Sequence, residues 1–138
     1  MGTSKGENRA LTREIASSVA RTHEGTKRCR RATACDYTIA GCELVAEGAD
    51  LRVQVLSLAA GQCVPWHYHS EISDSFVCLE GPMVVETRAP RHVYRLLPGD
   101  RCAVPPKTAH YVHREADGPC KFLIVQGVGV YDFVPVGG

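Results

Sequence analysis

The chain has 138 residues, of which 44% are hydrophobic and 22% charged, and its formal net charge is +1. This is the profile of one globular domain, long enough to bury a core without disulfide bonds. The near-neutral balance argues against a nucleic-acid partner, because binding to phosphates needs clustered Lys and Arg. No segment reaches the ~18 apolar residues of a membrane span, so we expect no membrane partner either.

Seven cysteines are an odd number and form no C-x-x-C pair. A disulfide framework or a zinc ribbon is therefore not expected. The first residues, from Met1 to Glu7, lack the apolar core of a signal peptide. Free thiols without an export signal favour a reducing compartment, so we expect a cytoplasmic protein.

Residues 1–36 form a polar extension with few large apolar side chains. Leu11, Ile15 and Val19 are four residues apart, which predicts a short helix from about Ala10 to Arg21. The basic run from Lys27 to Arg31 is typical of a solvated tether, with a patch for an anionic partner as the alternative.

Residues 37–138 have the pattern of a β-domain. Leu51, Val53 and Val55 alternate with polar residues, which predicts a half-buried strand. Turn-forming Gly, Pro and Asp separate further expected strands at 64–69, 75–80, 83–87, 92–97, 102–104, 108–113, 121–126 and 130–134. Many short strands without a long helical pattern predict an all-β sandwich or barrel.

The segment from Trp66 to His69 contains a H-x-H pair. Side chains alternate across a strand, so His67 and His69 face the same side and suit one ion of Zn, Fe, Ni, Cu or Mn. By itself the pair is equally well explained as two half-buried structural histidines. Asp74 from the same hairpin and His110 from a later strand would complete a four-ligand pocket.

The spacing around these residues resembles the two-part signature of the cupin superfamily. Its first motif, G-x5-H-x-H-x(3,4)-E-x6-G, is matched by Gly61, His67, His69 and Gly81, with Asp74 in place of the Glu. Its second motif, G-x5-P-x-G-x2-H-x3-N, is matched by Gly99, Pro105 and His110, with Lys107 and Arg114 in place of the Gly and the Asn.

This resemblance, over about residues 50–126, implies a small single-domain cupin. The expected fold is all-β, a double-stranded β-helix or jelly-roll barrel. The resemblance also implies one divalent metal ion (Fe, Mn, Ni or Zn) in the barrel mouth, bound by His67, His69, Asp74 and His110.

Three features of the motifs affect the site. Asp74 is one methylene shorter than Glu, so it would reach an ion through a water molecule or a shifted strand. Lys107 replaces a Gly, which raises the question of the φ angle in that turn. Arg114 lies an even number of residues from His110 and would clamp a substrate carboxylate, or alternatively reach solvent at the rim.

Strand alternation predicts the other pocket walls. Phe76 and Cys78 share the face of Asp74, and Val112 and Arg114 share that of His110. Cys78 is expected to be a buried, inert thiol, with a soft-ligand role as the alternative. Tyr94 and Arg114 are speculative catalytic residues. Trp66 and His113 should face away from the metal ligands, and His23 and His92 should lie at the surface.

The resemblance leaves two main functions open. One is a mononuclear metal enzyme for a small polar or anionic molecule, of dioxygenase, decarboxylase, isomerase or lyase type. The other is a non-catalytic barrel that binds a sugar or a small acid; a scaffolding barrel is a third possibility. The resemblance also implies a homodimer, and the apolar segment from Val128 to Val136 is suited to pairing of sheet edges.

Overall fold

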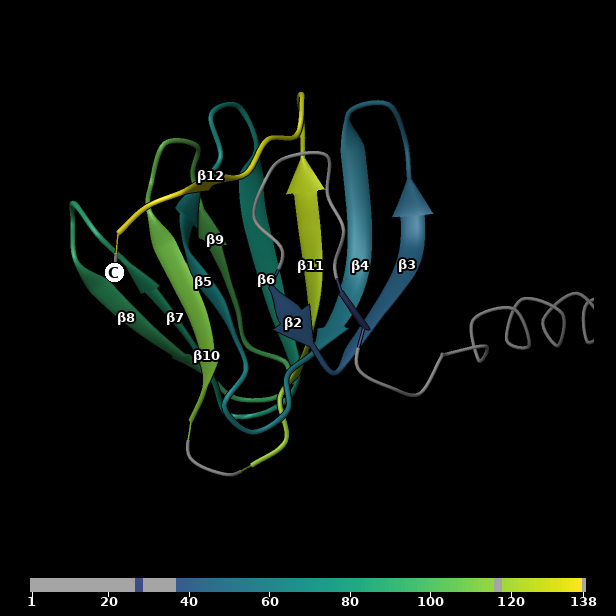
Figure 1. Ribbon diagram of the computed structural model, residues 1–138, viewed down its shortest axis with the longest axis vertical. Helices are drawn as coiled ribbons and strands as arrows, with labels where there is room; N and C mark the ends of the chain where they lie inside the picture. The colour runs from purple at the N-terminus through teal and green to yellow at the C-terminus, as the bar shows by residue number, and fades with distance from the viewer. Residues whose placement is uncertain (1–26, 29–36, 116–117, 138) are drawn as a thin grey trace, which may run out of the picture.

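The structure is a computed structural model that describes residues 27–28, 37–115 and 118–137 (Figure 1). These residues form β-strands and no helix. The helix expected between Ala10 and Arg21 lies outside the described residues, as does most of the basic run. Of that run, Lys27–Arg28 forms strand β1, which pairs with β2 (Thr38–Ile39).

Two five-stranded antiparallel sheets make up the domain (Figure 1). The first sheet has the order β12-β5-β10-β7-β8, and the second has the order β3-β4-β11-β6-β9. The strand bounds are β3 Gly41–Glu47, β4 Leu51–Ser57, β5 Cys63–Tyr68, β6 Ser73–Glu80, β7 Met83–Thr87, β8 His92–Leu96, β9 Arg101–Val104, β10 His110–Arg114, β11 Lys121–Gly127 and β12 Val134–Pro135.

From β4 onward the chain passes back and forth between the two sheets, with β7 and β8 as the one hairpin kept within a sheet. This winding is that of a double-stranded β-helix, so the predicted all-β jelly roll is confirmed. It brings β5 and β10 side by side in one sheet, opposite β6 and β11 in the other. Of the candidate ligands, His67, Asp74 and His110 lie on these strands, and His69 directly follows β5.

Two strand predictions were wrong. The expected strand over 130–134 is reduced to Val134–Pro135, because Gly129 has a φ of +141° and turns the chain before it can pair. The segment instead buries the side chain of Phe133. The edge strand Gly41–Glu47 was missed because its mostly exposed side chains give no alternating pattern.

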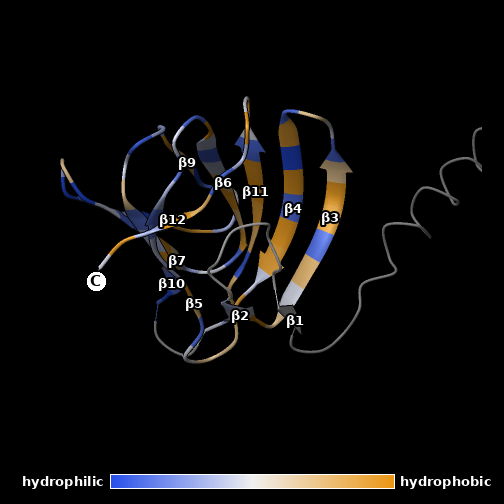
Figure 2. Ribbon diagram, turned by 45° about the horizontal axis from the view of Figure 1, so that its top comes forward, coloured by the Kyte–Doolittle hydropathy of each residue, from blue (hydrophilic) through white to orange (hydrophobic). Residues whose placement is uncertain are grey.

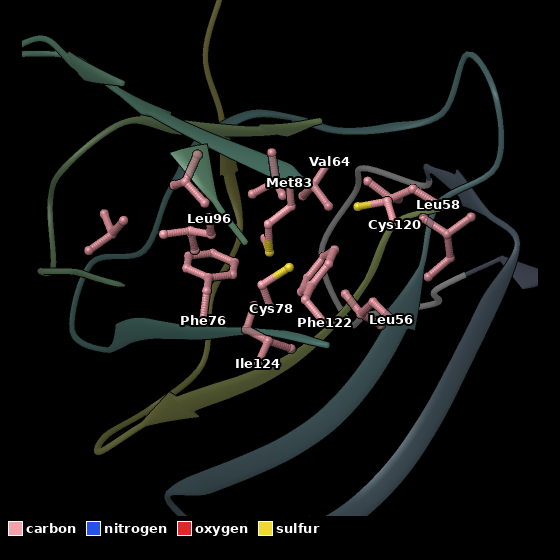
Figure 3. Close-up of a cluster of buried hydrophobic side chains, with 14 of the residues drawn as sticks. Leu56, Leu58, Val64, Phe76, Cys78, Met83, Leu96, Cys120, Phe122 and Ile124 are labelled. Atoms are coloured by element: carbon pink, nitrogen blue, oxygen red, sulfur yellow. The ribbon is translucent and has the colours of Figure 1, made fainter. Parts of the chain in front are cut away.

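The core lies between the two sheets and follows from the alternation of side chains. In β4, apolar and polar residues appear as alternating orange and blue bands (Figure 2). Phe76 and Phe122 are 1% and 0% exposed, and their ring centroids are 5.8 Å apart. Cys78 and Met83 pack against them (Figure 3). The expectation of a buried Cys78 thiol is confirmed.

Within the described residues there is no helix long and apolar enough to cross a membrane.

We predict that Phe122→Ala destabilises the fold by about 3–5 kcal/mol, because it leaves a cavity at the centre of the core. Urea denaturation measures this as a lower midpoint. Val93→Thr is the matched control: Val93 is 57% exposed on β8, and the change should cost less than about 1 kcal/mol. Equal losses in the two variants would contradict this description of the core.

Candidate metal centre

Three histidines and one aspartate converge at one end of the barrel. His67 comes from β5, His69 directly follows β5, Asp74 lies on β6 and His110 begins β10. All four are between 1% and 2% exposed. One ligand atom from each lies within 4.8 Å of all the others, so the four side chains form a group that could hold a metal ion.

The winding of the chain explains why these residues meet. His110 is paired with His67 across β10 and β5. Asp74 belongs to the facing sheet and points inward, as the burial pattern of β6 indicates. Its Oδ2 lies 2.7 Å from His110 Nε2, 2.8 Å from His69 Nε2 and 3.8 Å from His67 Nε2. The shorter Asp side chain therefore reaches the imidazoles directly.

The other ring nitrogens determine what these imidazoles offer. His67 Nδ1 lies 2.6 Å from the Pro65 carbonyl and His110 Nδ1 lies 2.8 Å from the Thr108 carbonyl. His69 Nδ1 lies 2.5 Å from the carbonyl of Asp132. A carbonyl only accepts hydrogen bonds, so each Nδ1 carries the proton and donates it. Each Nε2 faces Asp74, where it donates to the carboxylate when it carries a proton and offers a lone pair to a metal ion when the ring is neutral.

Burial and the close contacts within the group shift the pKa values of its members. Burial lowers the pKa of His67, against the opposing effect of the nearby Asp74 carboxylate. Burial would raise the pKa of Asp74, but its contacts with His110, His67 and His69 outweigh that effect and hold the pKa well below its usual value. A neutral imidazole and an ionised carboxylate are the forms that bind a metal ion.

Gln126 on β11 supports Asp74 and was missed in the sequence. It is paired with Asp74 across β11 and β6, and its Nε2 donates to Asp74 Oδ1 over 3.0 Å. One carboxylate oxygen is thus bound by Gln126, while the other faces the imidazoles. Gln126 is an even number of residues from the buried Phe122 and Ile124, so strand alternation places this polar side chain on the same inner face.

Lys107 adopts the backbone conformation for which the family pattern has Gly. Its φ is +61°, in the left-handed region that L-residues occupy at a cost of about 1–2 kcal/mol. The Lys107 N–H donates to the His69 carbonyl over 2.7 Å. The turn before His110 therefore has the backbone shape that the family's Gly would give it. It also binds the backbone of His69, another candidate ligand.

A small cavity lies beside this group, and of the four side chains His67 and Asp74 line it. It spans about 240 Å³ including its opening to solvent. The cavity is lined by Tyr37, Leu56, Val64, His67, Asp74, Phe76, Val112, Ile124, Gln126, Tyr131 and Phe133.

Only part of the predicted wall reaches this cavity. Phe76 and Val112 line it, whereas Cys78, Tyr94 and Arg114 are not among its lining residues. Arg114 donates from Nε and Nη2 to the Gly118 carbonyl. Arg114 shares a strand face with His110, but four residues along a strand separate them by about 13 Å. The same separation divides Cys78 from Asp74.

The residues expected to face outward do so. Trp66 stacks on Tyr111 with ring centroids 5.6 Å apart. His113 Nε2 lies 2.9 Å from Glu86 Oε2 on the same side of the sheet. His92 is exposed, while His23 lies outside the described residues.

Comparison with known proteins agrees with this fold and with the motif spacing. The family model described as "Cupin domain" matches residues 54–126. The chain belongs to the cupin family. No curated protein matches the chain.

Several solved structures share the cupin fold. An uncharacterized conserved protein with a double-stranded β-helix domain from Klebsiella pneumoniae has a TM-score of 0.60 and 18% identity, covering 90% of this chain and 95% of its own. The protein TT1209 from Thermus thermophilus has a TM-score of 0.58 and 20% identity, covering 82% and 93%. A recombinant oxalate oxidase in complex with glycolate has a TM-score of 0.57 and 12% identity, covering 62% and 46%.

The contacts of the Nδ1 atoms predict one tautomer for all three buried histidines. In protein titrated with one equivalent of Zn²⁺, we expect His67, His69 and His110 to carry their protons on Nδ1, because each faces a carbonyl. Long-range ¹H–¹⁵N spectra of histidine-labelled protein distinguish the two ring nitrogens. An Nε2–H form at any of the three would contradict the arrangement.

Proposed function

We propose that this cupin is a mononuclear metalloprotein in which His67, His69, Asp74 and His110 hold one divalent ion, Fe, Mn, Ni or Zn. The supporting observation is the meeting of three Nε2 atoms and a carboxylate oxygen in a buried space. With protons on Nε2 the rings bond to the carboxylate; with neutral rings, a metal ion among the four atoms would take the place of those protons. The donor set, with imidazole nitrogens and one carboxylate, fits a transition metal.

The proposed substrate is a small polar or anionic molecule. Among the described residues, the cavity lining contains no Lys or Arg, so an anionic group would find its positive partner in the metal ion. The remaining walls are mainly apolar and aromatic, and they keep water away from the reacting atoms. When bound, the metal supplies Lewis acidity or, with iron, activation of O2.

We assign the reaction no further than a metal-dependent dioxygenase, decarboxylase, isomerase or lyase. An oxalate oxidase has this fold, but at 12% identity the likeness concerns the fold alone. Of the side chains that line the cavity, Gln126 supports the carboxylate of Asp74. Phe76 and Val112 would orient a substrate by shape, since they offer no polar atoms.

The second candidate function is a non-catalytic barrel that binds a sugar or a small acid. The observation that favours it is the position of Tyr94 and Arg114, the two side chains expected to assist catalysis, away from the cavity lining. Turnover separates the two functions. A metal-loaded protein that binds small acids and leaves them chemically unchanged, with and without O2, would be the binding barrel.

The metal proposal predicts that protein purified without added ions contains roughly one equivalent of a divalent metal, and that His67→Ala and His110→Ala lower this to below about a tenth of an equivalent. Mass spectrometry of the metals measures the content. His113→Ala is the matched control, because this histidine lies on the outer face against Glu86. Equal metal content in all three variants would overturn the proposal.

We also propose that the protein is a cytoplasmic homodimer. The described cysteines are all free thiols, which suits a reducing compartment. Edge strand β3 is unpaired on one side within the described sheet. It exposes Leu44 and Val45 by 53% and 50%, and paired edges of two copies would cover such a surface.

The dimer is tested by analytical ultracentrifugation. At tens of micromolar, roughly where a modest interface assembles, we expect the sedimentation coefficient of a dimer. Leu44→Glu should shift the distribution toward monomer, because a buried charge would oppose edge pairing. Glu43→Gln on the same strand is the control. A wild-type protein that remains monomeric would count against the dimer.

A further inference from the structure

Gln126 has an amide whose two ends meet different surroundings. It is 4% exposed and lines the cavity beside the metal centre. Its Nε2 donates to Asp74 Oδ1 over 3.0 Å. The opposite orientation would bring two acceptor oxygens together, so the contact with Asp74 determines which end of the amide faces the carboxylate.

The other end of the amide lacks a donor. Gln126 Oε1 is buried and has no hydrogen-bond partner among the described residues. A buried acceptor without a donor is uncommon and costly in a folded protein. Because Gln126 lines a cavity, the missing donor has a place to come from, namely a molecule bound there.

We propose that Gln126 is a specificity residue whose Oε1 accepts a hydrogen bond from the ligand in the cavity. The site would thereby favour a small acid that carries a hydroxyl or amino group next to its carboxylate, over an acid of similar size that has only acceptors. This inference rests on the proposed function, since it assumes that the carboxylate of the ligand meets the metal ion.

The position of Gln126 explains how it would act. It spans from the carboxylate of Asp74, a candidate metal ligand, to the space that a substrate would enter. A donor on the ligand would satisfy Oε1. An acceptor-only dianion such as oxalate would instead leave Oε1 unpaired and bring further negative charge close to it. Discrimination between small acids thus depends on whether the acid carries a hydrogen-bond donor, rather than on its size.

The test uses Mn²⁺-loaded protein and two small probes, glycolate and fluoroacetate. Fluorine replaces the hydroxyl group with little change in size but removes the donor. Paramagnetic relaxation of the probe CH2 protons yields the Kd of each probe. Only the Mn²⁺-bound protein relaxes them, so partial loss of metal in a variant weakens the signal without changing the ratio of the two Kd values.

We expect wild-type protein to prefer glycolate. Gln126→Leu should lower the ratio of the fluoroacetate Kd to the glycolate Kd by about tenfold or more. Comparison between the variants removes the difference in how hydroxyl and fluorine meet the metal. Gln54→Leu is the matched control. Gln54 is also a buried glutamine, but it lies beside Cys42 and does not line the cavity. Its ratio should stay within about twofold of the wild type.

Two results would overturn the inference while leaving the metal centre intact. One is a ratio in Gln126→Leu within about twofold of that of the wild type. The other is Mn²⁺-loaded wild-type protein that binds neither probe. Failure of the wild-type protein to take up Mn²⁺ would instead refute the proposed function, and this inference with it.

Discussion

The hydrogen bonds from three imidazole Nδ1 atoms to backbone carbonyls are the contacts on which the site depends. Two of the carbonyls, at Pro65 and Thr108, are local, two residues before the histidines that they bind. The third belongs to Asp132, 63 residues beyond His69. The orientation of His69 therefore requires the chain after β11 to return across the barrel, which β12 secures by pairing with β5. The Ser70 N–H donates to Asp132 Oδ1 over 2.7 Å and fixes the same loop.

Much of the site was predictable because a β-strand repeats every two residues. Alternation placed His67 and His69 on one face, and the family spacing added Asp74 and His110 from two other strands. Alternation predicts which face of a strand a side chain occupies, however, and not how far along the strand it lies from the site. Arg114 and Cys78 share faces with His110 and Asp74, yet each lies four residues away along its strand, about 13 Å from the ligand.

The contacts that the sequence did not reveal come from register and from backbone atoms. Gln126 meets Asp74 because β11 and β6 pair with these residues opposite each other, and no local pattern specifies that register. The Asp132 carbonyl belongs to a segment expected to be a strand. Gly129 turns that segment. The segment then supplies the Asp132 carbonyl to His69 and the ring of Phe133, whose centroid lies 4.2 Å from that of His67.

The departures from the family motif do not separate the four candidate ligands, because other contacts compensate for them. Lys107 adopts the left-handed backbone, and its N–H still binds the carbonyl of His69. Asp74 is shorter than Glu, yet one of its oxygens meets two imidazoles while the other accepts from Gln126. The Gln126 amide donates to Asp74, and its Oε1 has no hydrogen-bond partner in the part of the chain that the structure describes. Gln126 Oε1 is an acceptor, and with neutral imidazoles so are the three Nε2 atoms and Asp74 Oδ2, so the proposed occupant is a cation together with a hydrogen-bond donor.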